Sequence, residues 1–541
     1  MKPHADRPCG LSLLRWILML SSGIAAILIF AGISHYPLWD DEAIDSLMGR
    51  AIIQTGDTSA IIGHNIMGYR NGLLLNKLRI EGEPPFTALA TACSMRLLGE
   101  SAFGARVPVA ILSFVGVLLI LWWIWKLQPS IVTTLLYLIG LLCNVSFYLY
   151  SRQCHYYGIA IFSFITIPFL YFNWNGRKSM LLLMGVCSAI LLASNYSFFL
   201  VLYACLFFDY IIWQRKVYCF TWTELAFLAI PPFLTGLVLM SWWNPFHTQM
   251  GSRVAHDSMI QRVELFLWHW RDLNRCEMIV GSLLILSPLV AFFCKDTWLK
   301  RALFAMGVYV ICMTILSTQS ISETSVSDVR YFSGLIPLFV FIEALTIRDL
   351  TRKAAWLAIP LALVAFGTNL LNGGPWQPWG LRSTIVNYVG ELLQPPSDPY
   401  SPAAQWIRSN IPKGDSVWVL PDYMAYPLMF HAPNAVYAWQ FRADQKAEQQ
   451  FNRLPDIHFQ GLVSPDYIVV FGPSALQVRP LLERWKVMGV RYDEIYRINT
   501  FWKDLYRPEL FWRTFKPITG FDIETQAIYI YKKQKTGKTE K

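Results

Sequence analysis

The chain has 541 residues, of which 54% are hydrophobic and only 15% are charged, whereas soluble domains carry roughly a quarter charged residues. The net charge is +10, but the Lys and Arg residues lie in short loops between apolar runs, which argues against a nucleic-acid-binding domain. The 10 Cys residues show no CxxC or Cys/His metal spacing and are interpreted as small buried hydrophobes. These features predict a polytopic membrane protein.

Apolar runs recur along the first two thirds of the chain. About eleven of them are long enough, or nearly so, to cross the roughly 30 Å hydrocarbon core of a membrane. They are residues 14–33, 107–125, 131–150, 158–173, 180–194, 197–213, 224–242, 278–294, 302–317, 332–347 and 354–371. We therefore expect a membrane α-helical fold of about eleven transmembrane helices, the first of them uncleaved.

The distribution of basic residues predicts the orientation. If the N-terminus is cytoplasmic, a short basic loop falls on that side after every second span, as the positive-inside rule requires. These loops contain Lys126, Arg177–Lys178, Arg215–Lys216, residues 295–301 and residues 348–353. The outer side then receives a long first loop, from about 34 to 104, and everything after about residue 372.

Three consecutive carboxylates open the first outer loop. Asp40, Asp41 and Glu42 follow the first span directly, and buried or crowded carboxylates are costly unless they are solvated, paired or used. Crowding also raises their pKa values, which suits one of them to accept a proton near neutral pH. An alternative for Asp40 is a structural role as the N-cap of a helix predicted over 43–54.

The same loop ends in a second acidic motif. Glu83-Pro84-Pro85-Phe86 precedes an amphipathic stretch over 87–98, which we expect to lie flat in the outer interface. The two prolines predict a rigid entry into that helix. Arg106 follows at the start of the second span.

Two later outer segments combine cations with aromatic rings. Arg152, His155 and Tyr157 follow the third span, and Arg330–Tyr331 precede the tenth. The planar fork of Arg binds phosphate, although each residue alone is also typical of an interfacial anchor. Together with the carboxylates they predict an outward-facing pocket for a lipid-borne substrate that carries a phosphate.

The long apolar runs end before the last third of the chain, which has the pattern of a soluble domain. We predict a polytopic membrane domain over 1–372, a linker rich in Pro and Gly over 373–401 and a soluble α/β domain over 402–541 on the outer side. In that domain, helices are expected at 403–409 and 476–485 and strands at 416–420, 467–471 and 528–531.

In their order and sidedness, these segments resemble the GT-C superfamily of membrane glycosyltransferases. The similarity is to polyprenyl-phosphate-sugar-dependent bacterial enzymes, protein O-mannosyltransferases and the aminoarabinose transferases of lipid A. It is carried by Trp39-Asp40-Asp41-Glu42-Ala43, Glu83-Pro84-Pro85-Phe86, residues 98–108, residues 153–157, Arg330-Tyr331 with Pro337, and residues 403–417.

The resemblance implies transfer of a hexosyl or pentosyl group from a polyprenyl-phosphate carrier to a lipid, glycan or protein acceptor, with inversion. It implies an inner (plasma) membrane location with a periplasmic C-terminal domain. By the resemblance Asp41 and Glu42 hold the catalytic carboxylate, and Asp40 leaves a one-residue ambiguity. The candidates for the donor phosphate and its surroundings are Arg330, Tyr331, Arg152, His155, Tyr157, Arg106 and Glu83.

Two departures from the family pattern are visible. Glu83 stands where the family often has His or Lys, and Gln153 and His155 stand where it often has an acid and Arg. Glu83 could therefore serve as a second carboxylate, with or without a divalent cation, and no cofactor is assigned. The alternatives are a multi-span transporter or flippase of lipid-linked sugars and a non-catalytic assembly or sensor protein.

Overall fold

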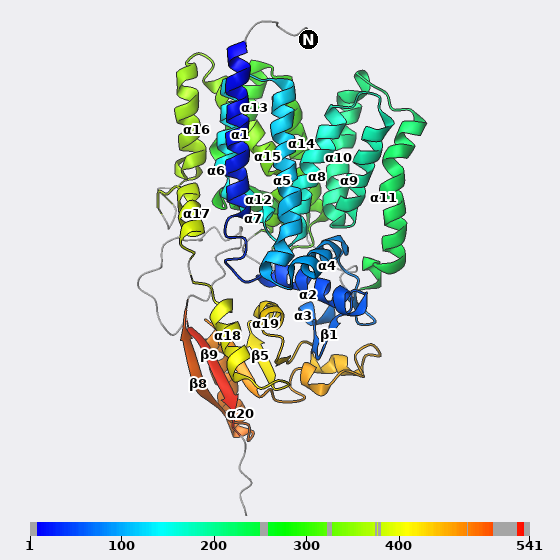
Figure 1. Ribbon diagram of the computed structural model, residues 1–541, viewed down its shortest axis with the longest axis vertical. Helices are drawn as coiled ribbons and strands as arrows, with labels where there is room; N and C mark the ends of the chain where they lie inside the picture. Colours follow the sequence, from blue (N-terminus) through cyan, green and yellow to red (C-terminus); the bar gives the residue numbers. More distant parts are fainter. Residues whose placement is uncertain are drawn as a thin grey trace, which may run out of the picture.

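A bundle of apolar helices forms one half of the molecule (Figure 1). The computed structural model describes residues 8–248, 258–321, 327–373, 376, 380–395, 397–472, 474–500 and 527–534. The bundle helices are α1 (Pro8–Phe30), α5 (Ala102–Leu127), α6 (Ile131–Cys143), α7 (Val145–Ser151), α8 (Tyr156–Phe172), α9 (Lys178–Leu192), α10 (Tyr196–Ile212), α11 (Trp222–Trp242), α13 (Gly281–Cys294), α14 (Thr297–Leu316), α15 (Ile336–Leu350) and α16 (Ala358–Gly367). Each predicted apolar run falls on one of these helices, except 131–150, which is divided between α6 and α7.

The length of these helices bears on the number of spans. Within the described residues, five helices are long and apolar enough to cross a membrane, or six when α6 and α7, which meet at a 62° bend, count as one. The other predicted spans form shorter apolar helices. The helical character is therefore confirmed, and the count of eleven spans stays a prediction.

The outward surface of the bundle is apolar. Trp16 on α1, Phe233 on α11 and Phe292 on α13 are 66%, 64% and 72% exposed. An exposed apolar face of this extent is unfavourable in water and is satisfied by lipid chains. We therefore interpret the protein as an integral membrane protein.

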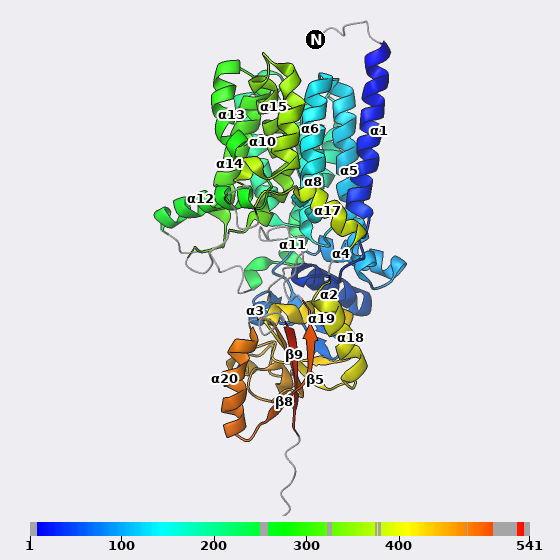
Figure 2. The ribbon, with the colours of Figure 1, turned by 90° about the vertical axis from the view of Figure 1, so that its left-hand side faces the viewer.

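Several short elements cross the end of the bundle that faces the C-terminal domain, called here the domain-facing end (Figures 1 and 2). They are α2 (Asp40–Thr55), α3 (Tyr69–Gly72), α4 (Phe86–Leu98) and α12 (Met259–Arg275), with the strands β1 (Ile61–Ile62), β2 (Asn65–Ile66), β3 (Leu75–Asn76) and β4 (Arg79–Ile80). A Cβ at Gly49 of α2 would lie 3.0 Å from the Met95 methyl group, so glycine lets α2 and α4 approach closely. The N-terminal end of α1 lies at the opposite end of the bundle.

The C-terminal domain contains a five-stranded sheet in the order β6-β5-β7-β9-β8. Its strands are β5 (Ser416–Leu420), β6 (Val436–Tyr437), β7 (Tyr467–Phe471), β8 (Tyr492–Asn499) and β9 (Ala527–Lys533), and its helices are α18 (Tyr400–Asn410), α19 (Ala425–His431) and α20 (Ser474–Val487). The first three strands are parallel, and β9 is antiparallel to both of its neighbours. All three predicted strands and both predicted helices are confirmed, whereas β6 and β8 were not predicted. The predicted linker contains a helix, α17 (Thr384–Leu393).

Candidate active site

Three carboxylates occupy the first turn of α2. The helix begins at Asp40, three residues before the predicted start, and its N-cap residue is Trp39 rather than Asp40. Asp40, Asp41 and Glu42 are buried, and Glu42 is inaccessible to solvent. The positive end of the helix dipole favours acidic groups at this position. Further stabilisation of the carboxylates comes from cations on distant segments.

Glu42 is bound by Arg106 of α5. Arg106 Nε and Nη2 donate to Glu42 Oε1 and Oε2 at 2.8 and 2.6 Å, and the Cys154 N–H donates to Oε1 at 2.8 Å. The remaining Arg106 donors bind the carbonyl oxygens of Ile33, Tyr36 and Pro37. A guanidinium has five N–H groups, and all five of these are directed at protein acceptors. The geometry thus favours a structural role for Arg106 over the predicted binding of phosphate.

Asp41 is bound by Arg330, which precedes α15. Arg330 Nη1 donates to Asp41 Oδ2 at 2.6 Å, and Tyr157 Oη donates to the same oxygen at 3.3 Å. Arg330 Nη2 also lies 3.5 Å from Asp328 Oδ1. Arg330 Nε is buried without a hydrogen-bond acceptor among the described residues. A carboxylate, a cation and an aromatic hydroxyl from three distant segments therefore meet, as the sequence predicted.

A second buried pair lies one helical turn further along α2. Asp45 Oδ2 binds His155 Nδ1, and both side chains are almost inaccessible to solvent. Burial raises the pKa of Asp45, and His155 only partly offsets this effect. Burial alone would lower the pKa of His155, but Asp45 raises it above its ordinary value. Asp45 was missed in the sequence, although its i, i+4 spacing from Asp41 places both on one helix face.

Glu83 lies within electrostatic range of both pairs. Its carboxylate is half-buried and accepts no hydrogen bond from the residues that the structure describes. The pKa of Glu83 is raised to about 7, chiefly by burial and also by the charges of Asp45 and Asp41, against the opposing charges of His155 and Arg330. We call Asp41, Asp45, Glu83, His155 and Arg330 the Asp41 cluster.

Two other predicted residues, Tyr331 and Arg152, have contacts outside this cluster. Tyr331 directly follows Arg330, and its carbonyl oxygen accepts the Tyr309 hydroxyl at 2.6 Å. Arg152 Nη1 instead donates to Tyr388 Oη at 2.8 Å, and so joins the end of α7 to α17. The described contacts of Arg152 are therefore with α17 and not with Asp41.

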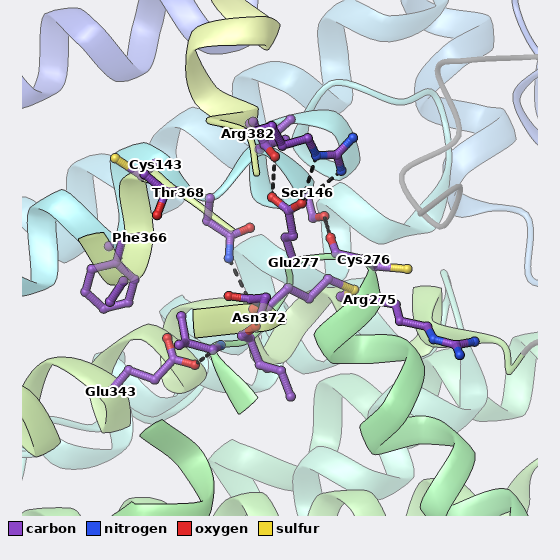
Figure 3. Close-up of a pocket in the computed structure, with 18 of the residues that line it drawn as sticks. Cys143, Ser146, Arg275, Cys276, Glu277, Glu343, Phe366, Thr368, Asn372 and Arg382 are labelled. Atoms are coloured by element: carbon purple, nitrogen blue, oxygen red, sulfur yellow. Dashed lines mark hydrogen bonds and ion pairs between the residues drawn. The ribbon is translucent and has the colours of Figure 1, made fainter. Parts of the chain in front are cut away.

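A pocket among the described residues lies apart from the cluster (Figure 3). It lies beside the break between α6 and α7 and encloses about 630 Å³, including space open to solvent. In its wall, Arg382 Nη2 binds Glu277 Oε1 at 2.8 Å, and Glu343 of α15 accepts the Val280 N–H at 2.6 Å. The predicted catalytic and donor-site residues are not among its lining residues. Glu343 was missed because its run is otherwise apolar.

The residues that the structure describes do not include a metal-binding cluster. In the part of the chain that the structure describes, no group of three or more His, Cys, Asp or Glu side chains is arranged to hold a metal ion. The use of a divalent cation with Glu83 stays an untested prediction.

Comparison with known proteins identifies the fold. No family model and no curated protein matches the sequence. The crystal structure of ArnT from Cupriavidus metallidurans bound to undecaprenyl phosphate matches with a TM-score of 0.54 and 9% identity, over 96% of this chain and 98% of ArnT. Apo ArnT matches with a TM-score of 0.50 and 12% identity, over 87% and 95% of the two chains. The apo oligosaccharyltransferase of Archaeoglobus fulgidus matches with a TM-score of 0.49 and 11% identity, over 85% and 70%.

The likeness to ArnT carries the structural conclusion. The chain has the fold of ArnT, and this likeness of fold bears out the resemblance to the GT-C superfamily that the sequence predicted. At 12% identity or less, the comparison establishes the fold alone, because one fold can host different activities.

Proposed function

We propose that the protein transfers a monosaccharide, a hexosyl or pentosyl group, from a polyprenyl-phosphate carrier to an acceptor on the outer face of the inner membrane. The observation that carries this proposal is the ion pair between Asp41 and Arg330, 2.6 Å long, within a cluster of carboxylates and aromatic rings. It is supported by the likeness to ArnT, one structure of which contains undecaprenyl phosphate.

The Asp41–Arg330 pair provides the two groups that such a transfer needs. An acceptor oxygen attacks the anomeric carbon, the bond from that carbon to the phosphate oxygen breaks, and the electron pair leaves with the phosphate. Asp41 takes the proton of the acceptor hydroxyl, and Arg330 neutralises the leaving phosphate. Attack opposite the leaving group inverts the anomeric carbon, and no general acid is required.

The same pair suggests how donor binding prepares the base. In the structure, Arg330 is held by Asp41 and Asp328. A phosphate that enters beside Arg330 competes for the guanidinium, because phosphate oxygens accept the same paired N–H groups as carboxylates do. Asp41 then loses a stabilising cation and becomes a stronger base. Glu42 and Arg106 keep the first turn of α2 in place during this exchange.

A transporter or flippase of lipid-linked sugars is the second candidate. Glu343 on spanning helix α15 is 1% exposed, and carboxylates within spans often mark transport pathways. The ion pair between Asp209 and Arg301 does not support a transport function, because its 2.6 Å contact neutralises both charges.

The test is sugar transfer by the full chain in liposomes that contain a polyprenyl-phosphate sugar pool. Since general-base catalysis contributes about 10²–10⁴-fold, Asp41→Asn should lose at least about 100-fold in activity. Asp444→Asn, an exposed outer-domain variant, is the matched control. If Asp40→Asn is inactive and Asp41→Asn is active, the base is Asp40. Lipid-linked sugar that crosses the bilayer without any transfer would support the flippase instead.

A further inference from the structure

The turn α3 has an unusual backbone. Arg70 and Asn71 have φ values of +49° and +56°, and Gly72 follows at +78°, so three successive residues are left-handed. Gly adopts this region freely and Asn tolerates it, but an Arg there is sterically unfavourable. Non-glycine residues persist in such conformations only where their surroundings impose them, and they cluster at functional sites.

The C-terminal domain imposes this conformation. Gln445 Nε2 donates to the Asn71 carbonyl oxygen at 2.9 Å. Gly68 lies so close to the domain that a Cβ there would come within 2.6 Å of the Gln440 carbonyl oxygen. A Cβ on Gly72 would lie 2.9 Å from the Phe441 ring. The turn is therefore shaped by a domain that begins more than 300 residues later in the chain.

Two further hydrogen bonds hold the C-terminal domain beside this turn. Asn65 Nδ2 donates to the Ala435 carbonyl oxygen at 3.0 Å, and Asn65 Oδ1 accepts the Tyr437 N–H at 2.8 Å. Both bonds are buried, so they act in low-dielectric surroundings. The first outer loop and the sheet of the C-terminal domain thus form one continuous support for α3.

The turn brings Tyr69 to the border of the Asp41 cluster. The Tyr69 ring packs against Tyr426, with centroids 5.9 Å apart, and lies within electrostatic range of Asp41 and Glu83. The Arg70 guanidinium lies over the Tyr69 ring, 5.3 Å from its centroid. Tyr69 thereby connects the position of Arg70 to the cluster.

Arg70 lies near a second cation and has no carboxylate partner among the described residues. It lies within electrostatic range of Arg330 and Tyr331. Among the described residues, no carboxylate lies within ion-pair distance of Arg70, and its side chain is exposed. An additional cation within electrostatic range of Arg330 raises the positive potential that an anion meets there.

We propose that Arg70 is a second phosphate-binding cation of the donor site, held in place by the C-terminal domain. This inference rests on the proposed function. The donor is a phosphodiester with one negative charge, and the carrier that leaves is a phosphate monoester with up to two. Arg330 already shares its charge with Asp41 and Asp328, so Arg70 supplies the additional positive charge as the glycosidic bond breaks.

The central variant is Arg70→Gly. Glycine accepts the left-handed conformation without strain, so this variant keeps the turn and removes only the cation. Arg70→Lys restores a charge without the planar fork. Gln445→Ala retains Arg70 but removes the bond that holds Asn71. Arg484→Gln, an exposed arginine of α20, serves as the control.

The measurements are donor and acceptor kinetics of the full chain in liposomes and inhibition by sugar-free polyprenyl phosphate, with inorganic phosphate as a second inhibitor. A charge-assisted hydrogen bond corresponds to about 10- to 100-fold. Arg70→Gly should lower kcat/KM for the donor and weaken inhibition by polyprenyl phosphate by that factor, with an unchanged KM for the acceptor. Arg70→Lys should recover part of the loss, and Gln445→Ala should show a smaller loss.

Three results would overturn the proposal. Unchanged donor kinetics and inhibition in Arg70→Gly, with Asp41→Asn inactive, would remove Arg70 and leave the proposed function intact. A rise confined to the acceptor KM would assign Arg70 to an anionic acceptor instead. Inhibition by inorganic phosphate alone would show a general anion site. If the wild type transfers no sugar, the proposed function fails, and direct binding of polyprenyl phosphate to the same variants still tests Arg70.

Discussion

Replacing Glu83 with glutamine should stabilise the folded protein at alkaline pH. Burial raises the pKa of this carboxyl group from 4.5 to about 7 in the folded state. An acid with a raised pKa binds its proton more tightly when folded, so ionisation destabilises the native state. This loss of folding free energy is absent below about pH 4.5, grows between about pH 4.5 and 7, and is constant above that range. A shift of this size corresponds to about 3 kcal/mol above pH 7.

The assay is thermal unfolding of the detergent-solubilised full chain between pH 5 and 8, followed by the fluorescence of its 22 Trp residues. Glu83→Gln should match the wild type near pH 5 and exceed its Tm at pH 8. Glu483→Gln, an exposed variant on α20, should leave the pH dependence unchanged. The pH profile of sugar transfer should also lose an ionisation near pH 7 in Glu83→Gln. Equal differences in Tm at pH 5 and pH 8 would refute this reasoning.

Two further predictions concern the pairs that surround Asp41. Glu42→Gln should destabilise the fold by about 3–5 kcal/mol, because it leaves Arg106 buried without its counter-charge. Denaturant unfolding measures this loss, and a double variant with Arg106→Met should recover part of it; no recovery would contradict a pairwise interaction. Asp45→Asn should lower the pKa of His155, since burial then acts on the imidazole without its carboxylate partner. An NMR titration of labelled histidines tests this change, and an unaltered His155 would refute it.

Local patterns in the sequence were sufficient for the apolar helices of the bundle and for three of the five strands of the sheet. A chain segment within lipid must satisfy its own backbone hydrogen bonds, so an apolar run of sufficient length is almost obliged to be helical. The runs SVWVL and YIVVF predicted β5 and β7 because β-branched residues suit buried strands. Glu343 was not predicted, because a single carboxylate barely changes the hydropathy of an otherwise apolar run.

The sequence alone determined that carboxylates, arginines and aromatic residues would gather at one end of the bundle. Only the tertiary structure decided how they pair. Asp41 and Glu42 are neighbours in the chain, yet their cations are Arg330, 289 residues away, and Arg106, 64 residues away. Successive side chains on a helix point about 100° apart, so their partners depend on which elements surround α2. The left-handed Arg70 was likewise beyond local prediction, because it is held by contacts with a domain from the other end of the chain.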